Sequence, residues 1–477
     1  MACNGSACKS NCYKDEEAGA AEVASCAQLA ERTKPGAAEA NPIANTLCIK
    51  CKVKEAISGY GGIDDGRFCA DCFRNNLFGK FRFAVTSNAM IAPTDKVLVA
   101  FSGALLLGLS SLSFRLLRVA LQFVHDMQHR SLKNFDASRD RSLPVFGVGV
   151  VFIDESAASP TPSSELEKAV KDISSIVASL TPPTKELHVV PIEAVYSSES
   201  SDGRDKLIKL VNAVSDSTGK EDLLLYLRML ALQKVASEFG YSRIVLGSCI
   251  SRIARHVISA TVKGQGYSLP ADIQYVDARW EIPVVLPLRD CFAQEINMLC
   301  RLDGLKTSLL STSPRSGINS LVSSFVQLLQ EENPSRESTI VRTAGKLIPF
   351  HFNRIPEIVD GKVPLATQRR RKRYNLKSNE SVSPESFCYL CNSPLDKSET
   401  VDLINLDNFR SSNIVDASCC SSCRFQILPR DTKSLEQFCT LLPQSVVARA
   451  KQLSNGNLSF RREQIQDCLL SDSEDET

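Results

Sequence analysis

Between Pro93 and Cys300 the chain alternates short apolar runs with longer amphipathic stretches. Apolar runs without polar alternation are typical of strands that are buried on both faces, and their alternation with helices is typical of a parallel sheet. The pattern therefore predicts an α/β fold built on a doubly wound parallel sheet. The predicted strands are Val97–Phe101, Val145–Ile153, Leu187–Ile192, Arg243–Gly247 and Ile282–Leu288.

The same pattern places helices between these strands and groups polar residues where the strands end. The predicted helices are Arg118–Arg130, Ser163–Leu180, Lys220–Phe239 and Ser251–Val262. In doubly wound sheets, ligands bind beyond the carboxyl ends of the strands. We therefore expect one edge of the sheet to collect Ser102, Gly103, Asp154, Glu155 and residues 247–251.

Cysteine is the second informative residue type, because eight of the 18 cysteines form C-x2-C pairs. The first pairs are separated by a spacing typical of a four-cysteine zinc site, and the alternative, a set of buried thiols, is less favoured. The later pairs have a longer separation, and Cys419 is an alternative ligand there. Because four cysteines leave no open coordination position, we expect two structural zinc ions. The proposed ligands are Cys48, Cys51, Cys69 and Cys72 at the first site, and Cys388, Cys391, Cys420 and Cys423 at the second.

The N-terminus contains neither a secretory apolar segment nor a mitochondrial presequence, which favours a reducing intracellular compartment. The uncharged run from Val97 to Phe114 raises the alternative of a membrane span. However, it contains serines and glycines and divides into a strand and a helix, so we expect no membrane association. The formal net charge of +2 requires any nucleic-acid surface to be a local patch.

One such patch is the run "RRRKR" in the segment 367–377, which is predicted to be a loop. Arginines and lysines of this kind contact nucleic-acid phosphates, and the alternatives are a solvated loop or a nuclear-import-like patch. The candidate residues for binding RNA are Arg369, Arg370, Arg371, Lys372 and Arg373.

Motifs along nearly the whole chain resemble the cytoplasmic tRNA 2-thiolation proteins, in the plant form of their second subunit. They include "FCADCFRNNLFGKFR", "KVLVAFSG", "RVALQFVHDM", "RIVLGSC", "LVSSFVQLLQEENPSRE" and "CCSSCRFQIL". The resemblance implies a pyrophosphatase-loop (HUP-like) fold and a cytoplasmic location. It also implies a role in 2-thiolation of the wobble uridine (mcm5s2U) of Lys, Glu and Gln tRNAs. The implied partners are tRNA, a related catalytic first subunit and, indirectly, a thiocarboxylated ubiquitin-like modifier that donates the sulfur.

The phosphate loop departs from the pattern S-G-G-x-D-S of working relatives. Ser102 and Gly103 match its start, but Ala104 replaces the second glycine and no aspartate follows before Asp126. Glycines let backbone amides approach phosphate, so we predict a degenerate nucleotide site and no use of ATP by this chain. The segment 104–117 matches neither a phosphate loop nor a helix start, which suggests an insertion, from a retained intron or a gene-model error.

The thiols that catalytic relatives use are also missing, because the helix at 220–236 contains no cysteine. Cys249 is the lone thiol expected at the carboxyl edge, and packing is favoured over sulfur transfer as its role. We therefore predict a non-catalytic subunit of a heterodimer. The alternatives are an independent ATP-dependent tRNA sulfurtransferase and a zinc-bearing scaffold without RNA contact.

The expected domain organisation follows from these motifs. A flexible segment (1–45) precedes an N-terminal zinc ribbon (46–92) and the pyrophosphatase-loop-like domain (93–300). A helical extension with the basic loop (301–380), a C-terminal zinc ribbon (381–430), and a helical end with an acidic tail (431–477) complete the chain.

Overall fold

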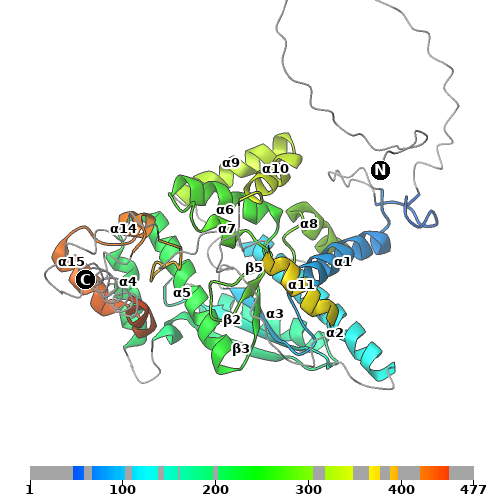
Figure 1. Ribbon diagram of the computed structural model, residues 1–477, viewed down its shortest axis with the longest axis horizontal. Coiled ribbons are helices and arrows are strands. Elements are labelled where there is room, and N and C mark those ends of the chain that lie inside the picture. Colours follow the sequence, from blue (N-terminus) through cyan, green and yellow to red (C-terminus); the bar gives the residue numbers. More distant parts are fainter. Residues whose placement is uncertain are drawn as a thin grey trace, which may run out of the picture. The chain divides into compact units, whose positions relative to one another are not determined.

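Figure 1 shows the computed structural model of the protein. The expected flexible segment 1–45 and the acidic tail lie outside the residues that the structure describes. From Leu47 onward, the described residues belong to one compact unit. The structure describes residues 47–57, 67–102, 110–137, 144–158, 162–196, 202–304, 317–347, 365–376, 387–395 and 419–450.

The centre of the fold is a six-stranded sheet with the order β3-β2-β1-β4-β6-β5. All neighbouring strands are parallel except β5 and β6, which pair antiparallel at one edge. The five predicted strands are confirmed, although β6 is much shorter than expected. The edge strand β5 was not predicted, because Val276 and Asp277 form no apolar run. The strands are β1 (Lys96–Ser102), β2 (Gly147–Asp154), β3 (Glu186–Pro191), β4 (Arg243–Val245), β5 (Val276–Asp277) and β6 (Val284–Val285).

Helices connect these strands and continue beyond them towards the C-terminus. In the first part of the chain they are α1 (Ala70–Ser87), α2 (Ser110–Ala137), α3 (Ser163–Ser179), the 3-10 helix η3 (Ile192–Val195), α4 (Gly203–Ala213), α5 (Ser217–Glu238) and α6 (Ile250–Val262). The later helices are α7 (Leu269–Asp272), α8 (Ala293–Leu302), α9 (Ile318–Glu332), α10 (Ser335–Ala344), α11 (Leu365–Leu376), α14 (Ser421–Gln426) and α15 (Thr432–Leu441).

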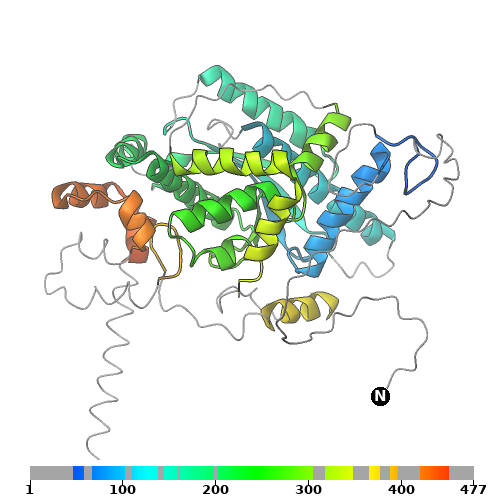
Figure 2. The ribbon, with the colours of Figure 1, turned by 90° about the horizontal axis from the view of Figure 1, so that it is seen from above.

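Side chains of β1 alternate between two apolar cores, one on each face of the sheet. Val97, Val99 and Phe101 join the core formed with α1, α2, α3 and α8. Leu98 and Ala100 join the core formed with α4, α5 and α6, which also contains cysteines of the C-terminal cluster. Figures 1 and 2 show helices on both sides of the sheet, with α9 and α10 packed on α6. The doubly wound architecture is therefore confirmed.

The beginning of α2 corrects the expectation for the leucine-rich segment. The helix begins at Ser110, so residues 110–117 form its first two turns, whereas 104–109 lie outside the described residues. Leu116 and Leu117 are buried in the core. A Cβ on Gly247 would approach the Leu117 side chain to 2.9 Å, which shows how closely α2 packs against the end of β4. The prediction that segment 104–117 does not contain the start of a helix is therefore wrong for residues 110–117.

Candidate functional site

The N-terminal cysteine cluster combines a tight turn with the start of a helix. Cys48 and Cys51 lie in the turn, where the amide of Lys52 donates to the carbonyl of Cys48 at 2.8 Å and Lys52 has a positive φ of 56°. Cys69 is the N-cap residue of α1, and Cys72 lies in the first turn of that helix. The four sulfur atoms all lie within 4.8 Å of one another.

The C-terminal cluster repeats this construction. The turn contains Cys388 and Cys391, and Asn392 has a positive φ of 58° and donates its amide to the carbonyl of Cys388 at 2.9 Å. Cys420 caps α14, and its sulfur accepts from the amide of Cys423. These four sulfurs also lie within 4.8 Å of one another. In both clusters the second cysteine pair thus begins a helix.

The spacing of the sulfurs suits a tetrahedral metal ion. A Zn–S bond of about 2.3 Å implies a separation of about 3.8 Å between two sulfurs of a tetrahedron. The distance from Cys51 Sγ to Cys69 Sγ is 3.8 Å, and that from Cys391 Sγ to Cys420 Sγ is 3.6 Å. Four thiolates and no carboxylate or histidine form a soft ligand set of the kind that zinc prefers. The residues therefore fit two structural metal ions.

Each cluster contains a thiol with a lowered pKa, whereas burial and the neighbouring thiols raise the pKa of Cys72, Cys391 and Cys423. Burial raises the pKa of Cys48, but backbone amides, that of Cys51 foremost, donate towards its sulfur and bring the pKa to about 6. Burial also raises the pKa of Cys388, but the neighbouring thiols hydrogen-bond to it and hold the pKa well below its usual range.

The structure also bears on the fifth cysteine of the C-terminal cluster. Cys419 is fully buried, and its sulfur lies 3.8 Å from that of Cys388. However, the four sulfurs that all lie within 4.8 Å of one another include that of Cys420 and not that of Cys419. The geometry therefore favours Cys420 as the ligand.

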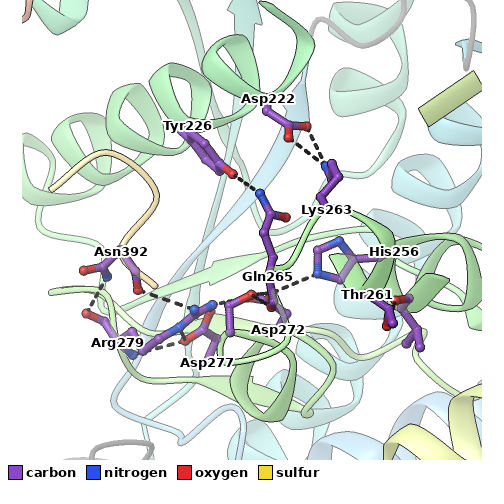
Figure 3. Close-up of polar contacts among 12 residues, drawn as sticks. Asp222, Tyr226, His256, Thr261, Lys263, Gln265, Asp272, Asp277, Arg279 and Asn392 are labelled. Atoms are coloured by element: carbon purple, nitrogen blue, oxygen red, sulfur yellow. Dashed lines mark hydrogen bonds and ion pairs between the residues drawn. The ribbon is translucent and has the colours of Figure 1, made fainter. Parts of the chain in front are cut away.

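Arg279 connects the C-terminal cluster to the sheet, and the sequence patterns did not identify it (Figure 3). Its side chain forms ion pairs with Asp272 and Asp277, and Asp272 also interacts with His256 at 2.8 Å. The Asn392 side chain donates to the backbone carbonyl of Arg279 at 3.0 Å, and the Arg279 guanidinium donates to the carbonyl of Asn392 at 3.4 Å. A long-range pair of this kind leaves no periodic signal in the sequence.

The carboxyl edge of the sheet is occupied by paired protein groups. Ser102 is the last residue of β1, and Gly103 lies outside the described residues. Glu155, which follows β2, is fully buried and forms an ion pair with Arg228 of α5, with a second contact at 3.0 Å. Arg252 of α6 donates to Ser113 of α2 at 3.2 Å. The parallel register places the ends of β1 and β2 together at this edge, as predicted. Glu155 neutralises Arg228 there, whereas Arg252 is hydrogen-bonded to neutral groups.

Cys249 lies at this edge as the N-cap residue of α6 and is fully buried. Burial raises the pKa of its thiol above the usual value. Because a thiolate is the reactive form of cysteine, a buried thiol with a raised pKa is a poor nucleophile. The geometry therefore supports packing as the role of Cys249.

The basic run forms helix α11, although a loop was predicted. Arg369, Arg370 and Lys372 are exposed, whereas Arg371 is only 3% exposed. The Nε and Nη2 atoms of Arg371 are buried without a hydrogen-bond partner. A helix distributes consecutive residues around its axis, so one of them must face the protein. Arg371 is therefore unavailable for contact with RNA, and the side chain of Arg373 is not described.

The comparisons with known proteins identify the family. The chain is 56% identical to the cytoplasmic tRNA 2-thiolation protein 2 of Arabidopsis thaliana over 476 residues, which covers 100% of both chains. The chain belongs to the cytoplasmic tRNA 2-thiolation protein 2 family. A model of this family matches residues 317–423. The family member from Oryza sativa subsp. japonica is 50% identical over 88% of both chains, and the human one is 24% identical over 91% of this chain and 95% of its own.

Among solved structures, the chain is similar to the U34-tRNA thiolase NcsA from Methanococcus maripaludis, which was solved with its 4Fe–4S cluster. The sequence identity is 18% and the TM-score is 0.44, over 66% of this chain and 92% of the thiolase. The relatives of this family carry the word cytoplasmic in their names. Among the helices of the described residues, none has the length and apolar character needed to cross a membrane.

The two cysteine clusters predict a metal content that can be measured. Purified protein should contain about two zinc ions per chain, because each set of four thiolates forms one closed tetrahedral site. Cys420→Ser should reduce the content to about one. The matched variant Cys419→Ser should retain both ions, because its sulfur lies outside the compact set. Elemental analysis of both variants measures this, and loss of zinc only from Cys419→Ser would reverse the ligand assignment.

Proposed function

We propose that this chain is a subunit of the cytoplasmic complex that thiolates the wobble uridine (U34) of tRNA at position 2, in forming mcm5s2U on Lys, Glu and Gln tRNAs. It acts with a related catalytic first subunit, and a thiocarboxylated ubiquitin-like modifier supplies the sulfur to the complex. The observation that carries this proposal is the 56% identity to a tRNA 2-thiolation protein over the whole chain.

Its part in the complex is non-catalytic. Phosphate binding needs backbone amides and uncompensated positive charge next to the nucleotide. At the carboxyl edge, Leu117 instead packs against Gly247, and Glu155 neutralises Arg228. Cys249 is buried with a raised pKa, so it is unsuited to receive sulfur. These features support a chain that does not use ATP, and they weigh against an independent ATP-dependent sulfurtransferase.

Two zinc ions complete the fold in this proposal. Cys48, Cys51, Cys69 and Cys72 would hold one ion, and Cys388, Cys391, Cys420 and Cys423 the other. Four protein ligands leave no position for water or substrate, so each ion stabilises local structure without activating a reactant. Each ion would thereby hold a cysteine turn against the start of a helix, α1 at the first site and α14 at the second.

Exposed cations of α11 provide the contact with tRNA. Arg369, Arg370 and Lys372 point to solvent from one short helix, where they suit phosphate contacts that position a folded RNA. Arg371 contributes to the packing of this helix instead. The helical form of the run supports this interface over a scaffold without RNA contact, because it places three exposed cations on one short helix.

Reconstitution tests the division of labour between the subunits. This chain alone should form no 2-thiouridine in tRNA and no AMP from ATP, because its carboxyl edge is filled by protein groups. Addition of the related first subunit, with the thiocarboxylated modifier and ATP, should restore thiolation. Mass spectrometry of digested tRNA measures the product. Thiolation by this chain alone, or equal thiolation by the first subunit without it, would contradict the proposal.

Salt dependence tests the interaction between α11 and tRNA. Replacing Arg369, Arg370 and Lys372 with alanine should weaken tRNA binding by the complex. The slope of log K against log salt should also become less steep, by roughly 0.7 to 0.9 for each phosphate that is no longer neutralised. A control with the exposed residues Lys168 and Lys171 of α3 replaced should bind normally. Binding isotherms at several salt concentrations measure the slope, and an unchanged slope in the α11 variant would remove this helix from the interface.

A further inference from the structure

A cavity of about 620 Å³ lies beside the C-terminal cysteine cluster, away from the carboxyl edge of the sheet. Its wall combines α5, the turn between β5 and β6, the cysteine turn at Asn392, and residues 444–449. Trp280, the single tryptophan of the chain, is part of this wall. A volume of this size is in the range of small-ligand sites, and several separate elements contribute to it.

The charges of the wall are largely compensated by neighbouring groups. Arg279 is paired with Asp272 and Asp277, and the Lys234 amine donates to the carbonyl of Ala194 at 2.7 Å and lies 3.8 Å from Glu238. Arg449 is the exception, because its Nη2 atom is buried without a hydrogen-bond partner among the described residues, and Glu281 adds a negative charge to the wall. Apart from Arg449, the cations of the wall are therefore already paired.

The remaining chemistry suits a flat, uncharged ring with polar edges. Trp280 contributes an aromatic side chain to the wall, and Leu230 and Ala448 add apolar groups. Ser237, Gln444 and Ser445 bring hydroxyl and amide groups to the same wall, and all three residues are exposed. Aromatic stacking combined with amide and hydroxyl hydrogen bonds is how proteins hold unpaired nucleobases.

We propose that this cavity binds the base of an unpaired nucleotide of the tRNA, stacked on Trp280. The inference rests on the proposed tRNA function and adds a second contact, distinct from the phosphate contacts of α11. Gln233 holds the wall in shape, because its side chain accepts from the amide of Ile282 at 2.9 Å and donates to the carbonyl of the same residue at 2.8 Å. The backbone of this part of the wall is therefore held in position before the base binds.

The metal cluster shapes this cavity through the cysteine turn. Asn392 lines the wall, follows the ligand candidate Cys391 directly, and exchanges hydrogen bonds with Arg279, which lies next to Trp280 (Figure 3). Loss of metal from the C-terminal cluster would release this turn from its position. Base binding should therefore depend on the C-terminal cluster and be independent of the N-terminal one.

Fluorescence of the single tryptophan gives a direct test. Full-length protein is titrated with a short oligouridylate and, separately, with an abasic oligonucleotide of the same length. The oligouridylate should quench Trp280 emission saturably, because stacking brings the base against the indole, and the abasic strand should not. Ser445→Phe, which fills the mouth of the cavity from an exposed position, should weaken oligouridylate binding about tenfold or more. The matched variant Ser175→Phe, at an exposed site of α3, should bind like the wild type.

Several results would overturn the inference. These are the absence of saturable quenching, equal quenching by the abasic strand, and an unchanged affinity in Ser445→Phe. The titration needs neither tRNA nor the first subunit. If tRNA binding by the complex persists while the titration fails, the failure rejects only the base site and leaves the proposed function intact.

Discussion

The junction between the edge of the sheet and the C-terminal cysteine cluster depends on the buried guanidinium of Arg279. This side chain is paired with two aspartates and also reaches the backbone of the C-terminal cysteine turn. A buried charge is costly unless it is fully paired, so the arrangement is stable only when Asp272, Asp277 and the turn are all in place. Edge strand β5, which contains Asp277, thereby becomes coupled to a cysteine cluster more than a hundred residues later in the chain.

This coupling makes the C-terminal cluster part of the main core. Its cysteines pack in the same apolar cluster as α4, α5 and α6, while α1, which begins in the N-terminal cluster, packs on the other face of the sheet. The C-terminal cluster thus packs on one face of the sheet, and the helix that begins at the N-terminal cluster packs on the other. In the proposed function, the carboxyl edge between them has lost its use for nucleotide chemistry, and the contacts with RNA are made by α11 and by the cavity beside the C-terminal cluster.

The sequence predicted those features that rest on local patterns. Buried parallel strands produce continuous apolar runs, and thiols that share a metal require fixed spacing. The sheet and the two sets of four cysteines could therefore be predicted from the sequence. The start of α2 was missed because the serines and leucines of residues 110–117 do not form a clear capping signal. The burial of Leu117 could not be predicted either, because its side chain packs beside Gly247, which is distant in sequence. The inward orientation of Arg371 and the role of Arg279 depend on tertiary contacts in the same way.

Hydrogen exchange in metal-site variants tests most directly whether the C-terminal cluster organises the sheet edge. Cys391→Ser removes a ligand candidate of that cluster, and Cys51→Ser is the matched change in the N-terminal one. The account predicts faster amide exchange in residues 276–285 of Cys391→Ser, because Asn392 no longer holds Arg279, and near-normal exchange there in Cys51→Ser. Equal protection of this segment in the wild type and Cys391→Ser would contradict the account.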